Sequence, residues 1–476
     1  KAPAKPAAAA ARIVVYDGFE FTAPASWPVY RLDEHPQTCV RYDVHAIYLG
    51  TPGADMRCAA GLIGRTQTVS FIPSQPAATG AAAGRAGRPD GGGGTAIQRL
   101  PALDTTITQD TVAHELQVAL GPASVTGTYG TDSASVKQIL DSLRAAPSGA
   151  ASTAQSAPAQ SSKPASSREK SLFTGPAPAT PGQAKSRSKS KSESKAKSKP
   201  KSTSKAKPKK AAPAKPAPSA TSSSWQGVPA HWPIQIIQPT PPPPPQPVAT
   251  VPVSGFDTCA APSLATMKAW RAAYAAAGVY IGGVNTGCAQ ANLSASWTQS
   301  VGGLGYGMLP VYVGPQAPCW DHRGVLVNPA TAVADGKAAG TNAVNRARAY
   351  GLSTGSPIYY DMEAYVGSAG CTTAVLTFLG AWDQQVNASG YLSGVYSSEL
   401  SGIRDLQAAT AGRMAGFTPP NAIWIAQWDN VASLIDGTLA WPLTDRSKQY
   451  GGPANVTVGG ITLNIDRDFV GGPVAR

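Results

Sequence analysis

The sequence predicts two folded domains, a small N-terminal α+β domain and a C-terminal (β/α)8 TIM barrel, joined by a disordered linker. Three observations support this prediction. The chain has 476 residues, a length typical of two or three domains. Residues 147–250 are a low-complexity stretch rich in Lys, Ser, Pro and Ala. In residues 251–476, strand-like and helix-like segments alternate throughout.

The first domain is assigned to residues 13–146, after an expected mobile tail at 1–12. Short β-branched and aromatic runs alternate with turns, at 13–16, 19–21, 29–32, 46–49 and 69–72. A Gly-, Ala- and Arg-rich break near 76–94 predicts a flexible insertion. The domain ends in a predicted helix, because apolar residues recur at helical spacing at Val136, Ile139, Leu140 and Leu143. Asp132 or Ser133 is expected to cap this helix.

The cysteines indicate disulfides and not a metal site. Cys39 and Cys58 lie in the first domain and are expected to pair there. Four more lie in the second, where three pairings are open: Cys259, Cys288, Cys319 and Cys371. Even numbers favour disulfides and an oxidising compartment. No C-x-x-C or Cys/His cluster occurs, so we expect no metal and no cofactor, and His45 and His114 are expected to be surface or core residues.

Almost all of the net charge of +13 is concentrated in the linker. Between residues 151 and 224, sixteen Lys and Arg face two Glu, a net +14 that leaves about −1 for the remainder. The Ser-Lys-Ala-Pro repeat has too little apolar content to offset the entropy of ordering, so we expect disorder. Five prolines at 241–245 predict a stiff spacer.

The lysines of the linker have two interpretations. They form a solvated tether, or they bind a polyanion through charge alone. Interleaved aromatics and a folded nucleic-acid motif are both missing, so an anionic wall polymer is the expected partner and nucleic acid is not. The sequence has no apolar run of membrane-spanning length. We therefore expect a secreted or wall-associated monomer, whose Lys- and Ala-rich opening is compatible with removal of a signal peptide.

Eight strand-like segments with intervening helices predict the barrel of residues 251–476, with an open doubly wound sheet as the alternative. The strands are expected at 251–257, 279–285, 307–314, 357–363, 394–398, 422–429, 447–450 and 461–470. The helices are expected at 263–277, 293–302, 328–350, 372–388 and 399–411.

Acidic residues recur at the ends of these strands. Asp257 ends the first, and Asp361 and Glu363, which share one face of their strand, end the fourth. Asp466 ends the last, which should neighbour the first across the closure. Carboxyl ends of barrel strands meet at one rim, so these acids should ring one cleft. Paired carboxyls suit glycosidic-bond chemistry, and their crowding should raise at least one pKa.

Other polar and aromatic residues near strand ends are expected to contact the substrate: Tyr312, Tyr396, Gln427, Trp428, Asp429, Tyr450 and Asp468.

Five motifs in fixed order resemble the glycoside hydrolase family 25 lysozymes: Gly255-Phe256-Asp257, Tyr360-Asp361-Met362-Glu363, Ile423-Trp424-Ile425-Ala426-Gln427-Trp428, Gln449-Tyr450 and Ile465-Asp466. They are closer still to a glycoside-hydrolase-like family of unknown function found in secreted actinobacterial proteins. The resemblance covers residues 253–471 and does not reach the first domain or the linker.

Family 25 enzymes cleave the β-1,4 bond between N-acetylmuramic acid and N-acetylglucosamine in peptidoglycan. By position, the resemblance implies that Glu363 is the general acid/base and that Asp361 orients the N-acetyl group. Asp257 and Asp466 would maintain the electrostatics of the site. Several residues depart from the family pattern and put the substrate in question: Cys259, Cys288, Asp468 and the pair Trp428-Asp429.

Two functions are therefore expected. The first is a glycoside hydrolase acting on a bacterial cell-wall polysaccharide, with peptidoglycan as the candidate substrate. The alternative is a non-catalytic glycan-binding or structural wall protein that kept the cleft. An intact Asp361 and Glu363 favour the enzyme, since a protein that only binds has no need of a general acid.

Overall fold

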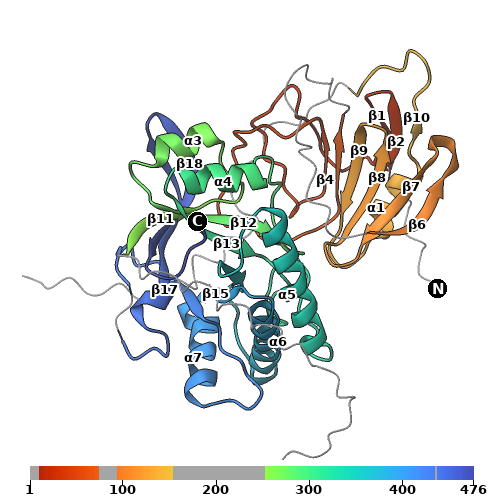
Figure 1. Cartoon of the computed structure of the whole chain (residues 1–476). Coiled ribbons are helices and arrows are strands. Elements are labelled where there is room, and N and C mark those ends of the chain that lie inside the picture. Colours follow the sequence, from red (N-terminus) through yellow and green to blue (C-terminus); the bar gives the residue numbers. More distant parts are fainter. Residues whose placement is uncertain (1–9, 74–93, 154–251, 435–436) are drawn as a thin grey trace, which may run out of the picture. The chain divides into compact units, whose positions relative to one another are not determined.

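The computed structural model describes residues 10–73, 94–153, 252–434 and 437–476 (Figure 1). The linker expected at 147–250, the insertion expected near 76–94 and the tail expected at 1–12 lie almost wholly outside these ranges. Within the described ranges, one folded region precedes the linker and one follows it.

The N-terminal region is rich in β-structure. Its strands are β1 (Ala11–Tyr16), β2 (Phe19–Pro24), β3 (Val29–Arg31), β4 (Ala46–Leu49), β5 (Thr68–Ile72), β6 (Thr95–Leu100), β7 (Thr105–Asp110), β8 (Glu115–Leu120), β9 (Ala123–Thr128) and β10 (Arg144–Ala145). A short 3-10 helix, η1 (Pro101–Leu103), joins β6 to β7. Three strands form a sheet in the order β1-β2-β10, and seven form another in the order β3-β4-β5-β9-β8-β7-β6.

One α-helix, α1 (Ala134–Asp141), covers this region's core, close to where the sequence predicts it. It buries Val136, Ile139 and Leu140. These side chains join strand residues such as Phe71 and Val125 in one apolar cluster. At the helix start the Asp132 carboxylate accepts a hydrogen bond from the Ala134 amide at 2.9 Å, the capping role expected for this acid.

Residues after the linker form a closed eight-stranded barrel. Its strands are β11 (Val253–Asp257), β12 (Ala276–Gly282), β13 (Gly307–Tyr312), β14 (Pro357–Asp361), β15 (Leu392–Ser398), β16 (Ala422–Ala426), β17 (Arg446–Val458) and β18 (Ile461–Val470). The helices are α3 (Leu264–Trp270), α4 (Ala295–Gly303), α5 (Ala332–Ala349), α6 (Ala369–Ala388) and α7 (Arg404–Ala411), and they lie outside the strands (Figure 1). The π-helix η2 (Glu399–Ile403) precedes α7, and the 3-10 helix η3 (Leu443–Asp445) precedes β17.

The end of the barrel differs from the predicted (β/α)8 pattern. Strands β11 to β17 pair in parallel, whereas β18 pairs antiparallel with both β17 and β11. No helix separates β17 from β18, because Gly459 and Gly460, with φ of +57° and +79°, form a two-residue hairpin turn. The strand predicted at 447–450 is therefore one arm of a long ribbon.

Strand alternation divides the barrel side chains into an interior and an outer layer. In β14, Tyr359 faces inward with Tyr280, Val311 and Trp424. Its neighbour Tyr360 faces outward and packs edge-on against Phe378 and Trp382 of α6. Asp361 is two residues beyond Tyr359 and so continues the inward face. The apolar floor of the barrel thus leads directly to an acidic side chain at its mouth.

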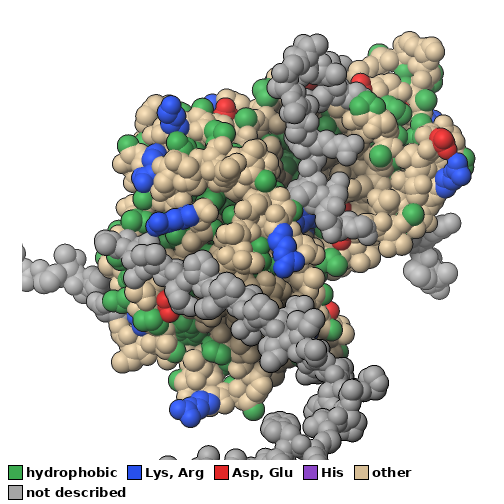
Figure 2. Space-filling model, in the orientation of Figure 1, with side chains coloured by type: hydrophobic (Ala, Val, Ile, Leu, Met, Phe, Trp, Pro, Cys, Tyr) green, Lys and Arg blue, Asp and Glu red, His purple; other side chains and the backbone are tan. Residues whose placement is uncertain are grey.

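Three disulfides are present. Cys39 pairs with Cys58, as predicted, and the pairings left open are Cys259–Cys288 and Cys319–Cys371. Among the described residues, no helix combines the length and apolar character needed to cross a membrane. On the face of the molecule in Figure 2, the described charged side chains are scattered and form no continuous basic patch.

Candidate active site

Strand register places two of the predicted acids opposite each other. Asp257 of β11 pairs directly with Asp466 of β18. Asp466 lies within β18 and not at its carboxyl end, because this strand runs antiparallel to its neighbours. The two side chains are brought together by the antiparallel pairing, and the predicted neighbourhood across the closure is present.

Asp257 is fully buried beneath the mouth. Its carboxylate accepts hydrogen bonds from the Tyr280 hydroxyl at 3.1 Å and from Gln449 Nε2 at 2.8 Å. Burial raises the pKa of Asp257 to about 6, although both hydrogen bonds act in the opposite direction. This carboxyl therefore keeps its proton at a pH where an exposed aspartate has lost it.

Asp468 adds a second buried acid beside the first. It is fully buried between β11 and β17, where it pairs with Gly255 and Gln449, and the Trp424 indole donates to it at 3.2 Å. Burial, followed by the negative charges of Asp257 and Asp466, raises the pKa of Asp468 well above its usual range. A neutral Asp468 beside Asp257 avoids two adjacent buried charges.

The acids of β14 are held through their main chain by Gln316, which follows β13. Gln316 Nε2 donates to the Asp361 carbonyl at 2.7 Å, and its Oε1 accepts from the Glu363 amide at 2.8 Å. Gln316 is fully buried, so this clamp is sheltered from water. Asp361 is buried as well, whereas Glu363 is partly exposed.

Tyr396 of β15 lies at the centre of these acids. Its hydroxyl donates to Gln449 Oε1 at 2.9 Å, and the Trp428 indole donates to the same oxygen at 2.7 Å. Burial raises the pKa of Tyr396 well above its usual value, and four negative charges add to the effect: Glu363, Asp361, Asp257 and Asp466. All four catalytic acids predicted from the sequence thus affect the pKa of this one hydroxyl. Gln449 connects it to Asp257.

The remaining predicted contact residues have other side-chain partners or join the group through the main chain. Tyr312 is buried under α5, where its hydroxyl donates to Asn342 Oδ1 at 3.1 Å. Asp429 accepts from the Lys448 ammonium at 2.7 Å. Tyr450 is stacked under the Arg467 guanidinium, 5.2 Å from the ring centre. Gln427 joins the group only through its main chain, by donating to the Gln449 carbonyl.

Four residues of the site were not predicted from the sequence: Tyr280, Gln316, Trp424 and Gln449. Gln449 lies near the end of the strand predicted at 447–450, so the strand-end pattern could have identified its amide. Tyr280 and Trp424 lie inside apolar strands. Without knowing which face of each strand points into the barrel, they cannot be told from ordinary core residues. Gln316 lies in a loop and gave no signal.

The cysteine sulfurs offer no alternative centre. Those of Cys39, Cys58 and Cys288 lie within 4.8 Å of one another. Each belongs to a disulfide, so none supplies the thiolate that a metal would bind.

Residues 268–470 match the family described as "Rv2525c-like, glycoside hydrolase-like domain". The match covers most of the barrel and less than half of the chain. The match includes Asp361, Glu363 and Asp466, whereas Asp257 and the whole N-terminal region precede it. No curated protein matches the chain.

Several solved structures are similar to this part of the chain. An uncharacterized protein of B. stearothermophilus is 17% identical, with a TM-score of 0.33, over 45% of this chain and 94% of its own. The Mycobacterium tuberculosis Tat-secreted protein Rv2525c is 15% identical, with a TM-score of 0.32, over 46% of this chain and 93% of its own. The Clostridium perfringens spore cortex lytic enzyme SleM is 11% identical, with a TM-score of 0.33, over 46% and 67%.

Proposed function

We propose that the barrel hydrolyses glycosidic bonds of a bacterial cell-wall polysaccharide, with peptidoglycan as the first candidate. The observation that carries this proposal is the gathering of acids from β11, β14 and β18 around Tyr396. The match of residues 268–470 to a glycoside hydrolase-like family supports it. The three disulfides support a site of action outside the reducing cytoplasm.

Glu363 is the proposed general acid/base. It is the acid of this group that is partly exposed, so a bound glycan can reach it, whereas Asp257, Asp361 and Asp466 are buried. The Gln316 clamp on its amide keeps the residue in place at the end of β14. A general acid must lie within hydrogen-bond reach of the leaving oxygen, and an anchored backbone restricts where its carboxyl can go.

The other acids have supporting roles in this proposal. Asp361 lies two residues before Glu363 and orients the N-acetyl group of the sugar. The negative charge of Asp466 stabilises the positive charge that develops on the sugar ring in the transition state. Asp468, whose pKa is raised well above its usual range, keeps its proton beneath the mouth, whereas Asp257, with a pKa of about 6, is protonated only at mildly acidic pH. Tyr396 and Trp428 are partly exposed and are the proposed contacts for the sugar rings.

The test is release of new reducing ends from purified peptidoglycan by the full chain. We expect Glu363→Gln to lower the rate by about 10²–10⁴-fold, the usual contribution of a general acid. Glu399→Gln is the matched control, because Glu399, which begins η2, is the barrel's other glutamate and is also partly exposed. It should retain the wild-type rate.

The same experiment separates the enzyme from the glycan-binding alternative. If neither wild type nor Glu363→Gln releases ends and both cosediment with the glycan, the protein binds without cleaving. The Lys-rich linker, which lies outside the described residues, remains a proposed tether to an anionic wall polymer.

A further inference from the structure

A loop of the N-terminal region, residues 59–64, contacts the barrel beside Asp466. The Ala60 amide donates to Asn464 Oδ1 at 2.8 Å. A Cβ placed on Gly61 would lie 3.7 Å from Asp466 Oδ2. Asn464 and Asp466 are alternate residues of β18, so both contacts fall on one face of this strand.

Main-chain pairing attaches this loop to the segment after β12. Ile63 forms an antiparallel bridge with Thr286, and the Gly64 amide donates to the Asn285 carbonyl at 2.9 Å. Further along the same segment, Arg41 forms an antiparallel bridge with Cys288. Residues 285–289 of the barrel thus form main-chain contacts with two segments of the N-terminal region, at residues 40–42 and 63–64.

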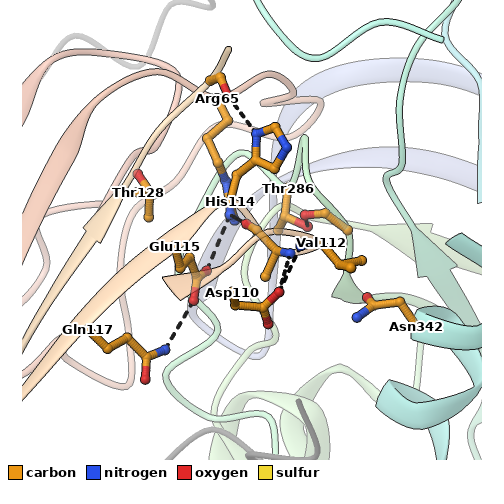
Figure 3. A network of polar contacts seen from close by, with 12 residues as sticks. Arg65, Asp110, Val112, His114, Glu115, Gln117, Thr128, Thr286 and Asn342 are labelled. Carbon is orange, nitrogen blue, oxygen red and sulfur yellow. Dashed lines mark hydrogen bonds and ion pairs between the residues drawn. The ribbon is translucent and has the colours of Figure 1, made fainter. Parts of the chain in front are cut away.

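A buried ion pair anchors the end of the loop. Arg65 is 3% exposed, and its guanidinium donates to the Ala113 carbonyl and, at 3.2 Å, to the Glu115 carboxylate (Figure 3). The Asp110 carboxylate holds the same turn by accepting from the Val112 and Ala113 amides. A loop fixed at its end and along its length has little freedom to move away from Asp466.

The position of Gly61 indicates what the loop does. Gly61 is exposed, whereas Asp466 is 3% exposed. The other oxygen of Asp466 is covered by Gly452, where a Cβ would lie only 1.7 Å away. The two oxygens of this carboxyl therefore lie against Gly452 on one side and against Gly61 on the other.

We propose that residues 59–64 form one wall of the glycan-binding mouth and that Gly61 determines which sugar unit fits beside Asp466. This inference rests on the proposed function, and it assigns part of the specificity of the barrel to a different domain. A glycine there leaves room for an N-acetylated sugar, and its φ of +65° disfavours a larger residue.

The test compares Gly61→Lys with Gly121→Lys in the full chain. Gly121 has a similar φ of +68° and no atom within 4 Å of its Cβ position, so both variants carry similar backbone strain. The first readout is the pKa of Asp466, which is measured by carboxyl NMR of aspartate-labelled protein. The Asp466 signal is assigned as the one that is missing in Asp466→Asn. The groups facing Asp466 include Asp257, Asp468, Tyr280 and Tyr396, and they are identical in both variants.

We expect Gly61→Lys to lower the Asp466 pKa by about one unit, since an opposite charge at close range favours the carboxylate. Gly121→Lys should leave it unchanged. The second readout is calorimetric binding of an N-acetylglucosamine tetramer, which Gly61→Lys should weaken by about tenfold or more. Equal Asp466 pKa values in the two variants would refute the placement of the loop, and a shifted pKa with unchanged binding would refute its role as a wall. If wild type binds no tetramer, the proposed function fails, and the pKa readout still decides whether the loop borders Asp466.

Discussion

Replacing Asp257 with asparagine should change how the stability of the barrel depends on pH. The pKa of Asp257 is raised from 3.8 to about 6 in the folded protein. Between these values the folded form retains a proton that the unfolded chain has released. The folded state is therefore progressively destabilised as the pH rises through this window, and nothing is lost below it.

The magnitude follows from the shift. About two pKa units at about 1.4 kcal/mol each correspond to about 3 kcal/mol of unfolding free energy lost between pH 4 and pH 6–7. Asparagine cannot ionise, and its amide can still accept from Gln449 and donate toward Asp468. Asp257→Asn should thus be the more stable protein at pH 7, by up to about 3 kcal/mol, and should differ little at pH 4.

The assay is urea unfolding of the full chain at pH 4, 5, 6 and 7, followed by far-ultraviolet circular dichroism. Asp383→Asn is the companion variant, since Asp383 of α6 is fully buried and burial raises its pKa well above the usual range. It should also gain stability at neutral pH, but without altering glycan binding. Parallel pH curves for wild type and Asp257→Asn would refute the reasoning, because the burial of Asp257 would then carry no proton linkage.

Two further predictions concern the framework. Glu115→Ala leaves the buried Arg65 guanidinium without its carboxylate and should cost about 3–5 kcal/mol by urea unfolding, whereas Glu34→Ala, whose pair with Arg31 is exposed, should cost less than about 1 kcal/mol. Equal losses would show that burial does not set the strength of these pairs. Removing the Cys319–Cys371 disulfide with paired alanines opens a 52-residue separation and should lower stability by about 4 kcal/mol, with retained binding of the tetramer. Unchanged thermal stability would contradict the expected constraint on the unfolded chain.

Much of the barrel could be predicted because its strands are apolar, short and regularly spaced. The predicted proximity of Asp257 and Asp466 depended only on closure between the first and last strands, and closure occurs with β18 in either direction. The direction itself was missed. Gly459-Gly460 between two alternating runs is a hairpin signal, and it indicates an antiparallel last strand where the regular (β/α)8 pattern predicts a parallel one.

The inward face of each strand was harder to predict than its position. In β13, Leu309 and Val311 face the barrel interior, so Tyr312 falls on the outer face under α5. Alternation tells which residues share a face but not which face is the interior. The role of Gln449 was harder still to predict from the sequence. Its amide connects Asp257, Tyr396 and Trp428, which come from three different strands or strand ends.

The antiparallel ribbon of β17 and β18 also constrains how the gene of such a domain can change length. Asp466 and Asp468 reach the interior only because every second residue of β18 points inward. Inserting or deleting one residue on the segment from Gly460 to Asp466 would turn both acids outward, unless a new bulge absorbed it. Natural length variants should therefore differ by matched pairs of residues added symmetrically at the Gly459-Gly460 tip, where the ribbon can grow without moving the acids.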